Sequence, residues 1–360
     1  MKNLVMTIKL LIVALLSEIR GKAPKIPHYG RCVFRLIRRL YAEGIDGYYH
    51  VGKAFLEVEM NVLSDRLKIS PDPMNPILIV VVKDDLLRMQ LLFKHYRSLG
   101  VSQFVVLDNG STDGTVDFCV AQEGTRVYHV ATPYDGNRKE GWVERVIRSI
   151  GVDRWYIVVD SDEMLDYPGR EQHPVQELIA RQSAMGNKRL YGYMLDMYSD
   201  KPLYSVTCTP DTIPQEFCWF DDDTYSLEEA LYGMKLPMGG PRQRMTGNRM
   251  WAGKCPVFLF DDDMSILSAH FMQPIVQISK TNLCCVLRHY KYLSQDKAVY
   301  QFRESQSSGF AYTTVEYKAI NEMTNRNRQA VMYCENSKKY KDSYSPASLP
   351  LLYCTFQKEA

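Results

Sequence analysis

Apolar positions follow two different periods along the chain. From residue 1 to about 72 they recur at helical spacing, notably in Cys32 to Tyr41 and in Ala54 to Leu67. The cluster Ser70-Pro71-Asp72-Pro73 then breaks the pattern, and short β-branched runs begin to alternate with helical stretches. We therefore expect a helical N-terminal region over residues 1–75, followed by a domain of strands and helices.

The alternation over residues 76–165 predicts a parallel sheet. Strands are expected at Ile77–Val82, Phe104–Leu107, Val127–Val130 and Trp155–Val159, and helices at Asp85–Leu99, Thr115–Gln122 and Gly141–Ile150. Strands joined by helices at this spacing form right-handed crossovers in a sheet covered on both faces. The expected class is α/β, with a mostly parallel, Rossmann-like sheet flanked by helices.

The second half of that domain, residues 166–320, is less regular. A helix is expected at Pro174–Met185 and strands at Leu190–Tyr198, Val257–Phe260, Ile266–Phe271 and Cys284–Tyr290. The connection over residues 200–238 is too long for an idle loop in a compact domain. Residues 321–360 are expected to form a C-terminal helix and a tail, polar and peripheral from Asn336 onward.

Acidic residues end the last strand of the first half. The segment Trp155 to Leu165 reads WYIVVDSDEML, in which a buried strand runs directly into Asp160, Asp162 and Glu163. Alternate residues of an extended chain point the same way, so Asp160 and Asp162 can share one cation, and oxygen ligands suit Mn²⁺ or Mg²⁺. The alternative is a helix cap or a surface turn.

Composition limits the partners and the compartment. The formal charge of +2 argues against nucleic acid as an obligate partner, and nine cysteines without a CxxC pair fit a reducing cytoplasm. Seven basic residues lie between Arg20 and Arg39, after an apolar segment too short to span a bilayer. They predict either peripheral contact with the inner face of the cell membrane or a docked helix with a solvated basic face.

A second polar turn strengthens the acidic site. Asp108 to Thr115 reads DNGSTDGT after a strand, and its small residues permit close approach by a ribose or a base, although an ordinary strand-to-helix turn has the same composition. Together with ILIVVVKDDLLRMQLLFKHYRSLGVSQFVVL before it and WYIVVDSDEML after it, this turn resembles the nucleotide-sugar-binding half of glycosyltransferase family 2, whose fold is called GT-A. Weaker blocks at Met194–Leu203, Gly239–Met245 and Leu287–Leu293 are similar to a bacterial subgroup and extend the resemblance over residues 76–320.

The resemblance implies a role for each candidate residue. Asp160, Asp162 and His289 would hold the metal, with Glu163 supporting them. The donor would contact Asp84, Asp108, Asn109, Gly239, Gly240, Arg242 and Lys291. Histidines are commonly core residues, so a hydrogen-bonded His289 is the alternative, and His270 is its competitor as ligand. Asp196 is the candidate catalytic base, with residues 261–263 and His270 as alternatives.

The implied activity is a metal-dependent hexosyltransferase-like enzyme, EC 2.4, that inverts the anomeric centre. It would move a sugar from a nucleoside-diphosphate sugar to a glycan or a lipid-linked acceptor, in assembly of a bacterial surface polysaccharide or lipopolysaccharide. A sugar-1-phosphate nucleotidyltransferase is one alternative, although KDDLLRM stands where its basic glycine-rich loop is expected. The other is a catalytically silent carbohydrate-binding or scaffold protein.

Overall fold

The computed structural model describes residues 57–134, 139–229, 235–305 and 311–358, except positions 263, 267, 269, 271, 274 and 275, and it also describes Phe55. The basic segment at residues 20–39 lies outside the described residues, as does most of the predicted helical N-terminal region. Within the described ranges, no helix is long and apolar enough to cross a membrane.

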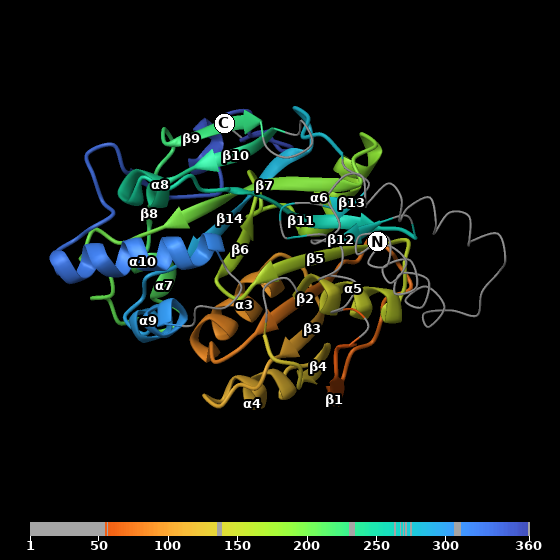
Figure 1. The fold of residues 1–360 in the computed structure, drawn as a ribbon. Coiled ribbons are helices and arrows are strands. Elements are labelled where there is room, and N and C mark those ends of the chain that lie inside the picture. Colours follow the sequence, from red (N-terminus) through yellow and green to blue (C-terminus); the bar gives the residue numbers. More distant parts are fainter. Residues whose placement is uncertain are drawn as a thin grey trace, which may run out of the picture.

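A nine-stranded mixed sheet forms the centre of the fold (Figure 1). Its strands, in spatial order, are β1 (Met60–Asp65), β4 (Thr125–Val130), β3 (Gln103–Asp108), β2 (Ile77–Val82), β5 (Arg154–Asp160), β11 (Gly253–Phe260), β7 (Arg189–Met197), β14 (Leu283–Tyr290) and β6 (Glu163–Asp166). The four strands β4, β3, β2 and β5 are parallel, β11 is antiparallel to both neighbours, and β7 and β14 are again parallel. The α/β expectation is confirmed, while the parallel arrangement holds chiefly in the first half.

The helices of the first half follow the predicted alternation. They are α3 (Leu86–Ser98), α4 (Thr115–Val120) and α5 (Lys139–Ile150). The chain steps outward from β2 to β3 to β4, and then returns past β2 to β5. Right-handed crossovers therefore place α5 on the opposite face from α3 and α4. The reversal of strand order lies between β2 and β5, where open α/β sheets form a crevice at the carboxyl ends of the strands.

One predicted helix is wrong. The helical spacing of Ala54 to Leu67 does not describe the end of that segment, because Met60–Asp65 forms strand β1, antiparallel to β4. Val62 and Leu63 are exposed on this edge strand. The hydrogen bonds offered by the free side of β4 override a weak helical preference, as tertiary context commonly does.

The second half confirms most of the expected elements. Helix α6 (Val175–Ala184) and strands β7, β11 and β14 lie where the pattern predicts them, but the strand expected at Ile266–Phe271 is limited to β12 (Ser265–Ile266), paired with β13 (Met272–Gln273). The long connection contains α7 (Ile213–Glu216), β8 (Trp219–Phe220) and β9 (Tyr225–Glu229), and it leads through β10 (Lys235–Gly239) to α8 (Pro241–Thr246). It is thus a structured insertion.

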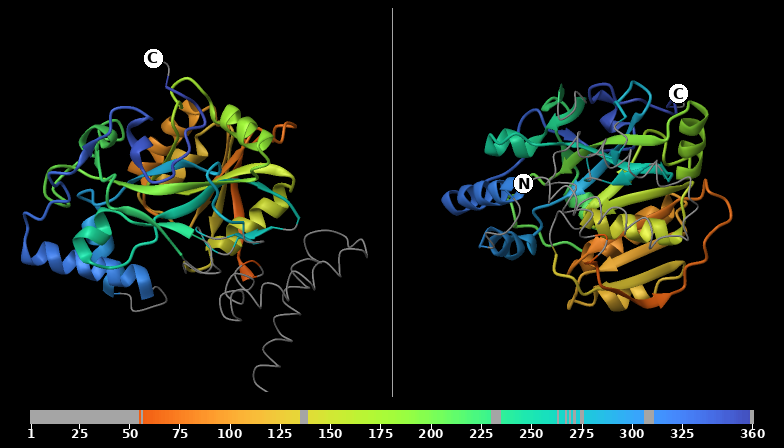
Figure 2. Two further views of the ribbon diagram at one scale, coloured as in Figure 1. Left: turned by 90° about the horizontal axis from the view of Figure 1, so that it is seen from above. Right: turned by 45° about the vertical axis from the view of Figure 1, so that its right-hand side comes forward.

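The C-terminal part covers the molecule more closely than its polarity predicts. Helices α9 (Asp296–Ser305) and α10 (Ala311–Arg326) lie side by side (Figure 1), and the boundary expected at residue 320 falls inside α10. After β15 (Lys338–Lys339) and η2 (Ser345–Ser348) the chain returns to α6 (Figure 2). Leu349, Leu352 and Phe356 are buried in the main core, so the prediction of a peripheral tail is wrong.

Candidate functional site

Three parallel strands end together at the reversal of strand order. Asp160 at the end of β5 stands beside Val81 of β2, and Asp108 at the end of β3 stands beside Val82. The two carboxylates predicted from separate motifs therefore lie at the same edge of the sheet, with the loop after β2 between them.

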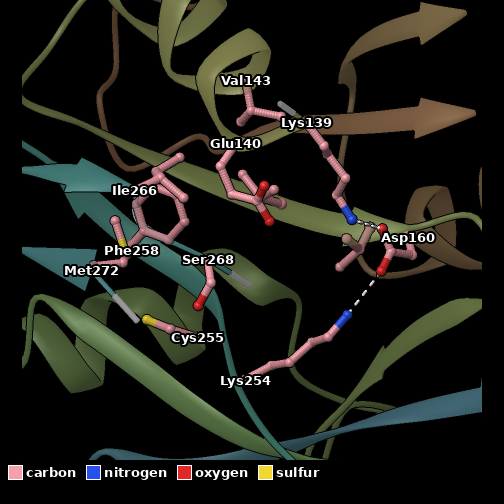
Figure 3. Close-up of a pocket in the computed structure, with 12 residues that line it drawn as sticks. Lys139, Glu140, Val143, Asp160, Lys254, Cys255, Phe258, Ile266, Ser268 and Met272 are labelled. Atoms are coloured by element: carbon pink, nitrogen blue, oxygen red, sulfur yellow. Dashed lines mark hydrogen bonds and ion pairs between the residues drawn. The ribbon is translucent and has the colours of Figure 1, made fainter. Parts of the chain in front are cut away.

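Asp160 is held by two lysines that approach from opposite sides (Figure 3). Lys139 of α5 pairs with Oδ1, and Lys254 of β11 donates to Oδ2 at 2.9 Å. Both lysines also line a cavity of about 30 Å³ under α5, which has room for about two water molecules. Burial would raise the pKa of Asp160, but the two ammonium charges outweigh burial and lower it.

Asp162, in the turn between β5 and β6, faces His289. Strand β14 lies between β6 and β7, so His289 has Glu163 on one side and Asp196 on the other. Its Nε2 lies 3.2 Å from Asp162 Oδ2 and its Nδ1 lies 2.7 Å from Asp196 Oδ1. Burial would lower the pKa of His289, but Asp162 and Asp196 together raise it.

Asp196 is enclosed rather than presented to a substrate. It is 3% exposed, and its second oxygen accepts from Nε of Arg242 at 2.8 Å. Burial would raise the pKa of Asp196, but Arg242 and His289 lower it to about 2. A carboxylate with both oxygens engaged is poorly placed to take a proton from an acceptor hydroxyl. Its surroundings favour a role in holding His289.

Arg242 and Lys291 continue this buried network toward α10. Arg242 donates through Nη1 to both oxygens of Glu316, at 3.1 and 3.2 Å. Lys291 Nζ lies 3.9 Å from Glu316 and packs over the rings of Tyr300 and Tyr317. The predicted donor-binding arginine is therefore engaged by carboxylates of the protein itself, whereas Lys291 keeps a side chain that is 14% exposed.

The loop after β2 is tied to the acidic turn. Ser161 donates to Asp85 Oδ2 at 2.5 Å, and Arg88 donates to Asp85, to the carbonyl of Tyr290 and to Asp296. Burial raises the pKa of Asp85 against the opposing effect of Arg88. These contacts fix the middle residue of the Asp160–Asp162 turn to helix α3.

In the Asp108 turn, a buried carboxylate oxygen lacks a hydrogen-bond partner within the described ranges. Oδ2 of Asp108 accepts from the N–H groups of Gly110 and Ser111, whereas Oδ1 is buried without a hydrogen-bond partner among the described residues. Asp84 adopts φ +49° and accepts from the N–H of Thr112. Asn109 donates to one main-chain carbonyl at the end of β4 and to another two residues later, so its amide supports the turn. Of the three predicted donor contacts, Asp108 has the clearest unused acceptor.

Gly239 and Gly240 serve a close main-chain contact in this structure. A Cβ on Gly239, at φ +102°, would lie 2.2 Å from the carbonyl oxygen of Thr224, and one on Gly240 would lie 2.9 Å from the ring of Tyr225. The two glycines thus let α8, which carries Arg242, begin directly against the β9–β10 hairpin. Their geometry is explained without a ligand.

Three ligand atoms are close enough to share a cation. One atom each from Asp162, Glu163 and His289 lies within 4.8 Å of the others, a group that does not include Asp160. The 3.2 Å between Asp162 Oδ2 and His289 Nε2 is close to the roughly 3 Å that separates adjacent ligands of an octahedral ion bound at about 2.1 Å. A carboxylate on the far nitrogen of a ligating histidine is the usual supporting arrangement, and Asp196 supplies it. His270 instead contacts the carbonyl of Gly253.

Sequence reasoning missed several partners of the site. Lys139, Lys254 and Glu316 carry no motif, although Lys254 is a lone charge at the start of the apolar run GKCPVFLF. Asp85, directly after Asp84, was a visible second carboxylate. A lone charge inside a predicted buried strand was the available signal, because it requires a partner.

No protein-family model and no curated protein matches this chain.

Proposed function

We propose that this chain is a metal-dependent glycosyltransferase that moves a sugar from a nucleoside-diphosphate sugar to a hydroxyl of a glycan or lipid-linked acceptor. The observation that carries the proposal is the convergence of the Asp108 turn, the Asp160–Asp162 turn and His289 at the reversal of strand order. Crevices at that position bind nucleotides in open α/β sheets. We also propose that the fold is of the GT-A type and that the reaction inverts the anomeric centre of the sugar.

The donor would lie across the ends of β3, β2 and β5. Asp108 Oδ1, which is buried and has no hydrogen-bond partner in the part of the chain that the structure describes, would accept from the base or the ribose. Lys291, held charged by Glu316 and Asp162, would lie beside the diphosphate. A nucleotide-sized ligand would thus use the unsatisfied acceptor and a preformed cation.

Asp162 and His289 would hold Mn²⁺ or Mg²⁺, and a mixed oxygen and imidazole set suits Mn²⁺. A bound cation would supply neutralisation of the charge that develops on the departing diphosphate. Asp196 would keep the proton on Nδ1 of His289 and so present Nε2 as the ligand. The proposal replaces the predicted role of Asp196 as base with this positioning role.

A screen of nucleotide sugars for Mn²⁺-dependent hydrolysis tests the proposal without requiring the acceptor. We expect one donor to be hydrolysed by the wild-type protein, and hydrolysis to fall by at least about a hundredfold in Asp162→Asn. Asp223, an exposed carboxylate between β8 and β9, provides the matched control, and Asp223→Asn should retain activity. Equal hydrolysis by wild type and Asp162→Asn would contradict the proposed site.

A further inference from the structure

The acidic cluster contains a built-in cation, the ammonium group of Lys254. This group donates to Asp160 Oδ2 at 2.9 Å and also pairs with Glu163 Oε1, so it lies between two of the three carboxylates of the DSDE segment. Its side chain is 9% exposed. A buried ammonium ion paired with two carboxylates stays protonated, which makes it a fixed charge in the site.

Both carboxylate oxygens of Glu163 already have partners in the protein. Oε1 is taken by Lys254, and Oε2 accepts from the main-chain N–H of Asp160 at 3.1 Å. The carboxylate is 1% exposed, whereas that of Asp162 is 19% exposed. A hydrated divalent cation can reach Asp162 and His289, whereas at Glu163 Oε1 it would face the ammonium charge of Lys254.

Both carboxylate oxygens of Asp160 are also paired with protein groups. Lys139 pairs with one oxygen and Lys254 with the other, so two cations already neutralise the carboxylate that the motif predicts as a metal ligand. Figure 3 shows the two side chains reaching Asp160 from either side. A second divalent ion beside these ammonium groups would face like charges at short range.

We infer that Lys254 occupies the Asp160–Glu163 half of the cluster, so that the site takes a single divalent cation at Asp162 and His289 and uses Glu163 as a support. This inference rests on the metal-binding part of the proposed function. On this inference, Asp162 is the metal ligand of the DSDE segment, and Asp160 and Glu163 are the partners of Lys254.

Mn²⁺ binding to the purified chain, followed by the electron paramagnetic resonance signal of free Mn²⁺, tests the inference without any sugar donor. The wild-type protein should bind one ion, and Asp162→Asn should lose that binding. Glu163→Gln should keep measurable binding, weakened by no more than about 10- to 100-fold, because a supporting carboxylate is lost and not a ligand. Lys254→Met should bind Mn²⁺ at least about tenfold more tightly, or bind a second ion, because the competing charge is gone.

Two further variants separate an effect on Mn²⁺ binding from an effect on folding. Lys254→Arg keeps the charge and should bind one ion as the wild type does, and Lys201→Met removes an exposed ion pair with Glu216 as a control. If Lys254→Met does not melt cooperatively, the inference is tested by comparing the Mn²⁺ binding of Glu163→Gln with that of Asp162→Asn. Loss of binding in Glu163→Gln equal to that in Asp162→Asn, or unchanged or weaker binding in a folded Lys254→Met, would overturn the inference alone. A wild-type protein that binds no Mn²⁺ would overturn the metal-dependent function with it.

Discussion

At the scale of single residues, each candidate side chain is defined by what holds it. His289 lies between Asp162 and Asp196, and Asp160 lies between two lysines, so neither motif residue acts as an isolated ligand. Burial alone would raise the pKa of Asp160, and the two ammonium groups beside it lower that pKa and favour the carboxylate. The chemistry of the site therefore depends on residues that no motif marks.

Asp196→Asn tests the positioning role. Loss of the negative charge on the Nδ1 side of His289 should weaken Mn²⁺ binding by about 10- to 100-fold, as loss of a supporting carboxylate usually does. Asp221→Asn is the matched control, since Asp221 is also a buried carboxylate paired with an arginine, Arg244. Wild-type Mn²⁺ affinity in a folded Asp196→Asn would refute the assignment.

The buried His95, which lies outside the candidate site, should make the stability of the protein depend on pH. Arg288 lies 3.4 Å from its Nδ1 and can only donate, so Nδ1 accepts, and Nε2–H donates to the carbonyl of Leu165 at 2.6 Å. Burial, reinforced by Arg288, holds the pKa of His95 well below 6.5. Below about pH 6.5 the unfolded chain binds a proton at His95, whereas the native state does not. The contribution of neutral His95 to the free energy of unfolding is therefore complete above about pH 6.5 and is lost as the pH falls.

Urea unfolding between about pH 7.5 and pH 5.5 measures this contribution, whose limiting slope is about 1.4 kcal/mol per pH unit. His95→Gln should flatten the profile over that range. His173→Gln, which removes a partly exposed histidine paired with Glu177, is the control variant. An identical slope in wild type and His95→Gln would show that His95 does not titrate differently on unfolding.

At the scale of elements, the site depends on where strands and short helices begin and end. Asp160 and Asp108 lie at the same edge of the sheet because β5, β2 and β3 end in register. Arg242 reaches Asp196 because α8 begins directly after β10, at a place where Gly239 lets two main-chain segments approach closely. A change in that contact should disturb folding before it disturbs any ligand.

Gly239→Ala should therefore lower the free energy of unfolding by at least about 2 kcal/mol, because the new Cβ meets the Thr224 carbonyl and φ is +102°. Gly247→Ala, at φ +71° with nothing within 4 Å of the added Cβ, should cost only about 1 kcal/mol. Chemical denaturation of both variants gives the comparison. Equal losses would indicate that φ alone, and not the contact with Thr224, sets the requirement for glycine.

At the scale of the whole molecule, the C-terminal segment is part of the fold. Tyr340 and Arg288 both bind Asp166, which lies at the end of β6 and is fully buried. Further on, Phe356 stacks on His173 with ring centroids 3.9 Å apart and lies under Arg181 of α6. Tyr340 and Phe356 thus attach the C-terminal segment to β6 and to α6.

Phe356→Ala should destabilise the protein by about 3–5 kcal/mol, because the ring is 2% exposed in the main core. Phe302→Ala, which removes an aromatic ring that is 64% exposed, should change stability by less than about 0.5 kcal/mol. Unfolding by urea measures both. A loss in Phe356→Ala as small as that in Phe302→Ala would mean that the tail contributes little to folding.

The sequence by itself determined the alternating first half and the carboxylates at its strand ends. Strands β2 to β5 and helices α3 to α5 are local, because apolar periodicity and turn residues specify them within short windows. The same locality places Asp108 and Asp160 at strand ends, and so predicts an acidic site before any tertiary contact is known.

The tertiary structure alone decided β1, the buried tail and the partners of each site residue. Lys254 and Asp160 are 94 positions apart, and His289 and Asp196 are 93 apart. Pairings at that distance come from strand order, which places β11 beside β5 and β14 beside β7. The local pattern of apolar and polar residues does not specify the order of the strands in the sheet. The sequence could therefore show which carboxylates the site contains, but only the fold could show that a lysine lies between two of them.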